Sequence, residues 1–305
     1  MTSAMSLEKA YAYCMKLAHS HYENFPVASV LLPKHLRQPI SAIYAFARTA
    51  DDFADEGNEP ENVRLSFLNQ YSLQLRQIQQ NDYDGNDPIF IALSDVIHNY
   101  HLPIDLFEDL LSAFRQDVVK NRYNTFDEVV DYCQRSANPV GRLLLHLMGQ
   151  PTTEQIEQSD AICTALQLIN FYQDIRQDIS EQNRVYIPLD KLHEKQLTID
   201  DITCENSIAL APILRSLYAQ TSAIMCMGLE LGNSLPGRLG WEIRAMTLGG
   251  IETLRQLQRQ SDRDVLNRPR LSRWKKLKVL TLSLSKNTLN KSLLMNTGIT
   301  DSDSD

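Results

Sequence analysis

The sequence predicts an all-α fold, and three observations support this prediction. Apolar residues recur at the i, i+3, i+4 and i+7 spacing of amphipathic helices through nearly the whole chain. Leu, Ala, Gln, Glu and Arg, which favour helices, are abundant, and the alternating β-branched runs of strands are few. Only 11 glycines occur in 305 residues. A chain of this length can bury a large core, and we expect a single all-α domain.

The expected helices follow one another along the chain. Leu7, Tyr11, Cys14 and Ala18 belong to the first apolar stripe, which indicates an amphipathic helix. Three prolines between residues 24 and 39 then interrupt the helical pattern. Further helices are expected near residues 38–55, 60–80, 88–100, 103–119, 125–148, 153–179, 206–233 and 238–260.

The rest of the chain differs from these periodic segments. Residues 181–205 are expected to form an ordered loop with short helical turns. We assign residues 1–285 to the helical domain. Residues 286–305, which end in TDSDSD, are expected to be a disordered polar tail.

Composition and charge exclude several classes of protein. A formal net charge of −8 argues against a nucleic-acid binder, because phosphate contacts need a basic surface. No uncharged apolar run approaches the roughly 18 residues of a membrane-spanning helix, and the N-terminal residues do not resemble a secretory signal. Five cysteines without CxxC spacing disfavour zinc and disulfides. We expect buried, reduced thiols in a cytoplasmic protein.

Two polar stripes interrupt helices that are otherwise apolar. At about 100° per residue, the members of the first stripe share an arc of roughly 60°. They are Tyr44, Arg48, Asp51 and Asp55. The second stripe spans an arc of roughly 80°. Its members are Gln167, Asn170, Asp174 and Asp178.

A solvated outer face is the ordinary meaning of a polar stripe, and for either stripe alone that alternative stays open. Other Asp-x-x-x-Asp pairs, such as 105/109 and 127/131, open helices, where acids favour the dipole. The flanks PISAIYAFARTA and AICTALQLINFY, however, leave little surface that favours water. Buried carboxylates stay ionised only beside cations, and Mg²⁺ prefers such oxygen ligands. We therefore expect the two stripes to face each other across one cavity.

Three blocks of sequence resemble a known family. YAFARTADDFADE (44–56) and LQLINFYQDIRQDISEQNRVYIP (166–188) are similar to the two Asp-rich signatures of the squalene/phytoene synthase family of head-to-head isoprenyl synthases. YCQRSANPVGRLLL (132–145) resembles its third signature. The likeness spans about residues 8–275, with the blocks in order. It implies an isoprenoid-synthase-like helical bundle around a central cavity.

Within that family, the chain most resembles the bacterial hydroxysqualene synthases of hopanoid pathways. HYENFPVAS (21–29) and SANPVGRLLL (136–145) carry this likeness. Other members tend to have a Gly-Thr-Val-Gly-like turn at positions 138–141. Glu23 and Asn24 also stand where other members often have basic and hydroxylic diphosphate contacts. This departure favours a member that works on one preassembled thirty-carbon diphosphate.

The resemblance implies a reaction and a cofactor. Presqualene diphosphate would react with water to give hydroxysqualene and diphosphate, and Mg²⁺ would neutralise charge on the leaving diphosphate. No NADPH is expected, because water and not hydride would capture the carbocation. The implied metal ligands are Asp51, Asp55, Asn170, Asp174 and Asp178.

The resemblance also assigns roles to other side chains. Arg48 would contact phosphate, with a salt bridge to a neighbouring acid as the alternative. Tyr44, Tyr132 and Phe171 would present ring faces to the carbocation, with plain core packing as the alternative. Gln167 would orient phosphate or the attacking water. The implied substrate-binding residues are His21, Asn24, Phe25, Arg48, Asn138, Gly141, Phe171, Arg184 and Tyr186, although loop packing is a second interpretation of the last pair.

Two other functions remain open at this point. One is condensation of two farnesyl diphosphates to presqualene diphosphate or squalene within the same family. The other is a non-catalytic helical module that binds prenyl lipids. A partnership with the presqualene-forming enzyme is a further expectation.

The basic segment 263–280 holds seven Lys or Arg residues and one Asp. A solvated terminal helix is the ordinary interpretation. The alternative is an element that meets anionic lipid, with Trp274 and Leu277 toward the membrane. It would place the enzyme peripherally on the inner face of the membrane.

Overall fold

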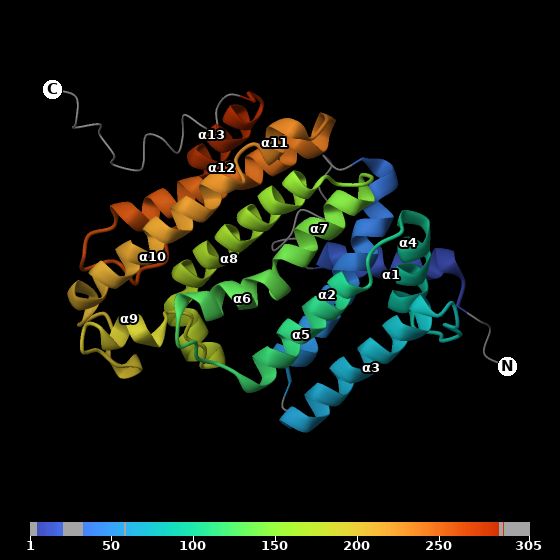
Figure 1. Ribbon diagram of the computed structural model, residues 1–305, viewed down its shortest axis with the longest axis horizontal. Helices are drawn as coiled ribbons and strands as arrows, with labels where there is room; N and C mark the ends of the chain where they lie inside the picture. The colour runs from blue at the N-terminus through green and yellow to red at the C-terminus, as the bar shows by residue number, and fades with distance from the viewer. Residues whose placement is uncertain (1–4, 21–32, 58, 287–288, 290–305) are drawn as a thin grey trace. The chain divides into compact units, whose positions relative to one another are not determined.

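The computed structural model describes residues 5–20, 33–57, 59–286 and 289 (Figure 1). Helices dominate this part of the chain, and the only β-pairing among these residues is an isolated bridge between Arg122 and Val185. The all-α prediction is confirmed. None of the helices in these ranges is long and apolar enough to cross a membrane.

The chain divides into two compact units. The N-terminal unit comprises Met1–Lys120 and Gln134–Thr152, and the C-terminal unit comprises Asn121–Cys133 and Thr153–Asp305. The assignment of residues 1–285 to one domain stays a prediction. The expected disorder of the tail falls almost wholly outside the described residues.

The N-terminal unit is built around one central helix. Helix α2 (Arg37–Asp55) contacts four neighbours, which surround an aromatic core. In that core the ring of Phe46 lies 5.4–5.8 Å from those of Tyr71, Phe90 and Phe107. Because helices enclose α2 in this way, packing fixes its rotation about its own axis. The direction in which its polar stripe faces is therefore fixed as well. The neighbours are α1 (Leu7–Ser20), α3 (Glu61–Gln79), α4 (Pro88–Tyr100) and α5 (Asp105–Val119).

The sequence predicts one helix over 125–148, and this prediction is wrong. The structure has α6 (Phe126–Ser136) and α7 (Asn138–Leu147), separated at Ala137. Pro139 has no N–H and lies in the first turn of α7, where a helix needs no donor. A new helix therefore starts within the third signature block.

The C-terminal unit is organised on α8 (Thr153–Gln182), which packs against α10 (Ser207–Met227) and α12 (Gly237–Arg259). The expected loop over 181–205 is confirmed, and its short helical turns are α9 (Leu189–His193) and η3 (Ile199–Asp201).

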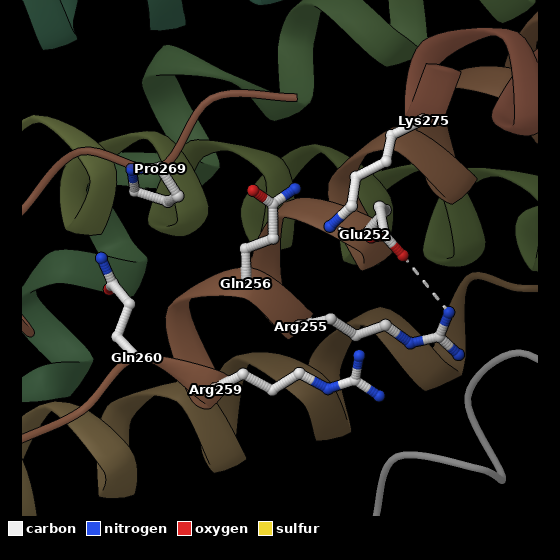
Figure 2. Close-up of a pocket in the computed structure, with 7 residues that line it drawn as sticks. All are labelled: Glu252, Arg255, Gln256, Arg259, Gln260, Pro269 and Lys275. Carbon is white, nitrogen blue, oxygen red and sulfur yellow. Dashed lines mark hydrogen bonds and ion pairs between the residues drawn. The ribbon is translucent and has the colours of Figure 1, made fainter. Parts of the chain in front are cut away.

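Two helical elements of this unit, α11 and α13, were not among the helices expected from the sequence. The predicted helix 206–233 is interrupted after Met227 by a turn, and α11 (Leu231–Ser234) follows. Helix α13 (Arg273–Ser283) lies along α12. A pocket of about 270 Å³ opens there (Figure 2), lined by side chains of both helices and by Pro269.

The cysteines only partly meet expectation. All five are free thiols, and Cys14 and Cys133 are buried. Cys204 and Cys226 are exposed, so the prediction of buried thiols is wrong for these two. Both lie outside the central packing, Cys204 in the loop before α10 and Cys226 near the end of that helix.

Candidate active site

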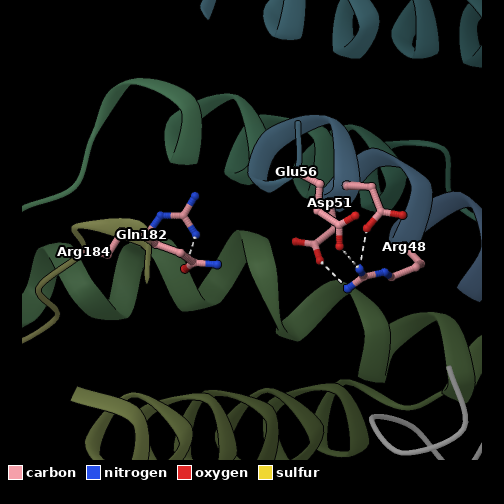
Figure 3. Close-up of polar contacts among 6 residues, drawn as sticks. Arg48, Asp51, Glu56, Gln182 and Arg184 are labelled. Carbon is pink, nitrogen blue, oxygen red and sulfur yellow. Dashed lines mark hydrogen bonds and ion pairs between the residues drawn. The ribbon is translucent and has the colours of Figure 1, made fainter. Parts of the chain in front are cut away.

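The first acidic stripe occupies the C-terminal half of α2, where Arg48 forms ion pairs with several carboxylates (Figure 3). Its guanidinium lies 3.4 Å from Oδ2 of Asp51 and 2.6 Å from Oε1 of Glu56, and it also forms an ion pair with Asp52. Spacings of three, four and eight residues bring all three acids to one side of the helix. The salt bridges left open as an alternative for Arg48 are therefore present.

Negative charge exceeds positive charge at this end of α2. The last turns and Glu56 carry four carboxylates, from Asp51, Asp52, Asp55 and Glu56, and one guanidinium, from Arg48. The C-terminus of a helix itself carries partial negative charge, which disfavours further acids. The last turn of α2 contains no basic residue. Such an arrangement attracts cations.

Tyr44 lies one turn before Arg48 on the same helix and is half-buried. Its hydroxyl is buried, and it has no hydrogen-bond partner within the described ranges. Burial raises the pKa of this phenol, Arg48 lowers it, and Asp52 and Asp51 raise it. A buried hydroxyl without a partner is costly. It is therefore suited to meet a ligand.

The second acidic stripe lies on α8 and is paired with a residue that the sequence did not suggest. Arg268, in the loop before α13, places Nε 2.6 Å from Oδ1 of Asp174. Its Nη2 donates to Oδ2 of Asp174 at 3.2 Å, and its Nη1 donates to Gln177 at 3.2 Å. The only sequence signal for Arg268 was the excess of basic residues in 263–280.

Both carboxylates on α8 have raised pKa values. The pKa of Asp178 is raised to about 7, chiefly by burial and then by the neighbouring charge of Asp174, while Arg184 and Arg268 oppose the rise. Burial likewise raises the pKa of Asp174, while Arg268 lowers it. Partly buried acids of like charge are stabilised in the ionised form by a nearby cation.

The donor atoms fit the metal that the family implies. Within the described residues, no group of three or more His, Cys, Asp or Glu could hold a metal ion. Each stripe instead offers two carboxylates, and on α8 Gln167 is half-buried and Asn170 is exposed. Mg²⁺ is usually bound by one or two carboxylates, with substrate phosphates and water completing its shell. These oxygen donors suit that mode of binding. The facing of the two stripes across one cavity stays a prediction.

The C-terminal unit holds a cluster of stacked aromatic rings. Phe171 and Tyr186 stack with centroids 3.5 Å apart and planes 6° apart. Tyr132 lies 6.1 Å from Phe171, and Tyr123 stacks on Tyr186 at 5.4 Å. Both Tyr132 and Phe171 are buried within this cluster, which is an apolar wall with electron-rich faces. Tyr123 was missed, because tertiary contacts bring it there, among them the bridge from Arg122 to Val185 and the hydrogen bond from the Leu189 N–H to the carbonyl of Tyr123.

The loop after α8 is tied back to the second stripe. The backbone N–H of Arg184 donates to the carbonyl of Asp178 at 3.0 Å, and its buried side chain donates to Gln182 at 3.0 Å (Figure 3). Tyr186 is buried in the aromatic cluster. Both residues therefore pack within the loop.

The remaining predicted residues lie elsewhere or outside the described ranges. Asn138, at the start of α7, is buried, and Gly141, on the same helix, is half-buried. His21, Asn24 and Phe25 fall within residues 21–32, outside the described residues.

The sequence is similar to a family model and to proteins of known function. The sequence model for squalene/phytoene synthase matches residues 18–275. A hydroxysqualene synthase from Rhodopseudomonas palustris is 36% identical over 77% of this chain and 80% of that protein. A second, from Sinorhizobium fredii, is 36% identical over 72% of this chain and 74% of that protein.

Solved structures show the same relationship. The squalene synthase HpnC from Alicyclobacillus acidocaldarius has 35% identity and a TM-score of 0.74, and the match covers 83% of this chain and 95% of that one. A dehydrosqualene synthase with a bound ligand has 23% identity and a TM-score of 0.75, which shows the shared fold.

The fold is that of the all-α isoprenoid synthases. The chain belongs to the squalene/phytoene synthase family, as the three signature blocks predicted. Enzymes of this family bind prenyl diphosphates and generally depend on divalent metal ions.

Proposed function

We propose that this protein is a hydroxysqualene synthase, which converts presqualene diphosphate and water to hydroxysqualene and diphosphate. The observation that carries this proposal is the pair of carboxylates on α8, whose raised pKa values favour a bound cation. The substrate assignment is supported by the names of the relatives at 36% identity.

The residues of both stripes would hold Mg²⁺ near the diphosphate. When bound, Mg²⁺ neutralises the charge that develops on the leaving group. The proposed ligands are Asp51, Asp55, Asn170, Asp174 and Asp178. Cleavage of the C–O bond leaves the electron pair on diphosphate and a carbocation on the thirty-carbon chain. Water then adds to that cation and loses a proton, so the products balance without NADPH.

Other side chains have proposed roles in this reaction. Arg48 would exchange one carboxylate partner for a phosphate oxygen, since charge-assisted contacts of Arg suit phosphate. Tyr44 would donate its unpartnered hydroxyl to the diphosphate or to water. Gln167 would orient that water. Tyr132 and Phe171 would provide the apolar aromatic wall that excludes bulk water from the cation.

The remaining substrate contacts are proposed from the family resemblance. They are His21, Asn24, Phe25, Asn138, Gly141, Arg184 and Tyr186. Arg184 is supported by its backbone link to Asp178, which keeps the loop close to the second stripe. The proposed partner is the enzyme that forms presqualene diphosphate. The proposed location is cytoplasmic, peripheral to the inner face of the membrane.

Condensation of two farnesyl diphosphates is a second candidate function. It is favoured by the 35% identity to a structure described as a squalene synthase. The two functions differ in substrate, and one assay therefore separates them.

The test is product identification by mass spectrometry. Purified protein with Mg²⁺ receives presqualene diphosphate or farnesyl diphosphate, without NADPH. Hydroxysqualene from the first substrate is the expected result. Rapid consumption of farnesyl diphosphate with no reaction of presqualene diphosphate would overturn the proposal in favour of the second candidate.

A further inference from the structure

Helix α13 presents its apolar side chains to solvent. Trp274 is 81% exposed, Leu277 is 52% exposed and Leu280 is 43% exposed. Leu284, directly after the helix, is 66% exposed. At about 100° per residue these four side chains lie within roughly 120° of one another. An ordinary surface helix turns its apolar stripe inward, so the orientation of this helix is reversed.

Polar contacts hold the opposite side of α13 against α12. The buried Ser283 accepts a hydrogen bond from Trp241 Nε1 on its hydroxyl, and its carbonyl accepts one from Arg244 Nε at 2.7 Å. At the other end of the helix, Lys275 Nζ lies 2.9 Å from Oε1 of Glu252. The inner side is thus fixed at both ends, and the apolar stripe stays on the outside.

Positive charge surrounds this stripe. The sequence of α13 contains four cations and no acidic residue, although the whole chain has a formal net charge of −8. Lys276 and Lys278 flank the stripe on the helical wheel, where long basic side chains reach the phosphate level of a bilayer. The cations are Arg273, Lys275, Lys276 and Lys278.

The pocket beside α13 is also basic. Its lining includes Arg255, Arg259 and Lys275 together with Glu252, which lies 3.5 Å from Arg255 (Figure 2). Arg259 is exposed, and it forms no ion pair with any residue that the structure describes. The three cations outnumber the one carboxylate, so the lining has an excess of positive charge. This charge suits an anionic group such as a phosphate monoester or diester.

We propose that α13 is a docking helix for an anionic phospholipid bilayer, and that the pocket lined by Arg255, Arg259 and Lys275 receives a lipid phosphate. The inference deepens the proposed peripheral location and rests on it.

Charge distinguishes two possible partners of this surface, a second copy of the chain and an anionic bilayer. A symmetric contact with a second copy would bring two sets of cations together, whereas an anionic bilayer complements both the cations and the apolar stripe.

The test uses the full-length protein and vesicles of phosphatidylcholine, with or without phosphatidylglycerol, in a sedimentation assay. We expect binding to the anionic vesicles, a blue shift of Trp274 emission, and loss of binding at high salt. Trp274→Ser with Leu277→Ser is expected to weaken this binding about tenfold or more. Leu73→Ser is the matched control, because Leu73 is 56% exposed on α3, and it is expected to bind as the wild type does.

A second variant tests the phosphate pocket. Arg259→Gln is expected to reduce the preference for anionic over neutral vesicles about threefold to tenfold. Lys195→Gln, which removes an exposed cation of another loop, is expected to leave this preference unchanged. Equal effects of the two substitutions would overturn the phosphate site. Equal binding of wild type to neutral and anionic vesicles would overturn the docking helix, as would a concentration-dependent dimer in lipid-free solution that Leu277→Ser abolishes.

An activity assay in detergent keeps the two proposals separate. The α13 variants are expected to convert presqualene diphosphate at the wild-type rate there, because they leave both acidic stripes intact. A wild-type protein that binds anionic vesicles but makes no hydroxysqualene would remove the proposed reaction and leave the docking helix standing.

Discussion

Arg268 forms a bidentate ion pair with Asp174, with Nε 2.6 Å from Oδ1 and Nη2 3.2 Å from Oδ2. The two residues are 94 positions apart, and the pair joins the loop before α13 to the second acidic stripe. Because the Arg268 side chain is 46% exposed, the pair contributes little to stability. Its greater effect is electrostatic: a fixed positive charge lies among carboxylates that are suited to a metal ion.

Removal of this charge is expected to strengthen metal binding to the substrate-free protein. Arg268→Ala should raise the affinity for Mn²⁺, used as a paramagnetic substitute for Mg²⁺, about threefold to tenfold at low salt. The reason is that a cation near Asp174 opposes a second cation at the same carboxylates. Electron paramagnetic resonance of free Mn²⁺ measures the affinity.

Arg270→Ala is the matched control, since Arg270 is an exposed cation of the same loop. It is expected to leave the affinity unchanged. An Arg268→Ala protein that binds Mn²⁺ no better than this control would show that the guanidinium and the metal do not share the carboxylates.

Loss of one carboxylate from either stripe is expected to abolish most activity. Asp51→Asn and Asp174→Asn should each lower kcat about a hundredfold or more, because each removes charge stabilisation from the leaving diphosphate. Steady-state rates with presqualene diphosphate and Mg²⁺ measure the change.

Asp105→Asn provides the comparison, because Asp105 belongs to another Asp-x-x-x-Asp pair and is exposed at the start of α5. Its rate is expected to match that of the wild type. Full activity of the Asp174→Asn protein would show that this carboxylate takes no part in the reaction, whereas no turnover by the wild type would support the non-catalytic lipid-binding module that the sequence left open.

The helices were predictable where periodicity was uninterrupted. The segment expected over 38–55 is α2 (Arg37–Asp55), and the one expected over 88–100 is α4 (Pro88–Tyr100). The failure at Ala137 has a simple cause. Apolar residues continue in helical register through Pro139, so periodicity alone does not show that one helix ends and another begins.

The candidate site was predictable where its residues share a helix. Spacing alone aligned Asp51 with Asp55 and Asp174 with Asp178. Residues that tertiary contacts bring in were not predictable. Tyr123 reaches the aromatic cluster through a β-bridge, and Arg268 reaches α8 from a loop whose only signal was its basic composition.

Two glycines of α12 give a matched test of its packing. A Cβ at Gly240 would lie 2.3 Å from the carbonyl oxygen of Leu235 and 2.9 Å from that of Gly232. Because these are backbone atoms, Gly240→Ala should lower the free energy of unfolding by about 1–3 kcal/mol. A Cβ at Gly249 would meet nothing within 4 Å, and Gly249→Ala should raise it by up to about 1 kcal/mol. Urea denaturation measures both, and equal changes would contradict the close approach at Gly240.

The raised pKa of Asp178 predicts an unusual pH dependence of stability. Its pKa rises from an ordinary value of 3.8 to about 7 in the folded protein, so the folded state favours the protonated form. Ionisation of this group therefore costs stability progressively as the pH rises above about 4, and the cost is complete above about pH 7. Asp178→Asn removes that cost. In metal-free protein it is expected to raise Tm by about 2–4 °C at about pH 8 and to leave Tm unchanged at about pH 4.

Calorimetry in EDTA checks this prediction, and Mg²⁺ with diphosphate provides the contrast. Bound cations stabilise the ionised carboxylate, so the ligands should raise the Tm of the wild type more than that of Asp178→Asn. Asp160→Asn, half-buried on the same helix and outside the stripe, serves as the control. If Asp178→Asn instead lowers the metal-free Tm at about pH 8, then the ionised carboxylate stabilises the fold. That result would contradict the prediction that ionised Asp178 destabilises the metal-free protein.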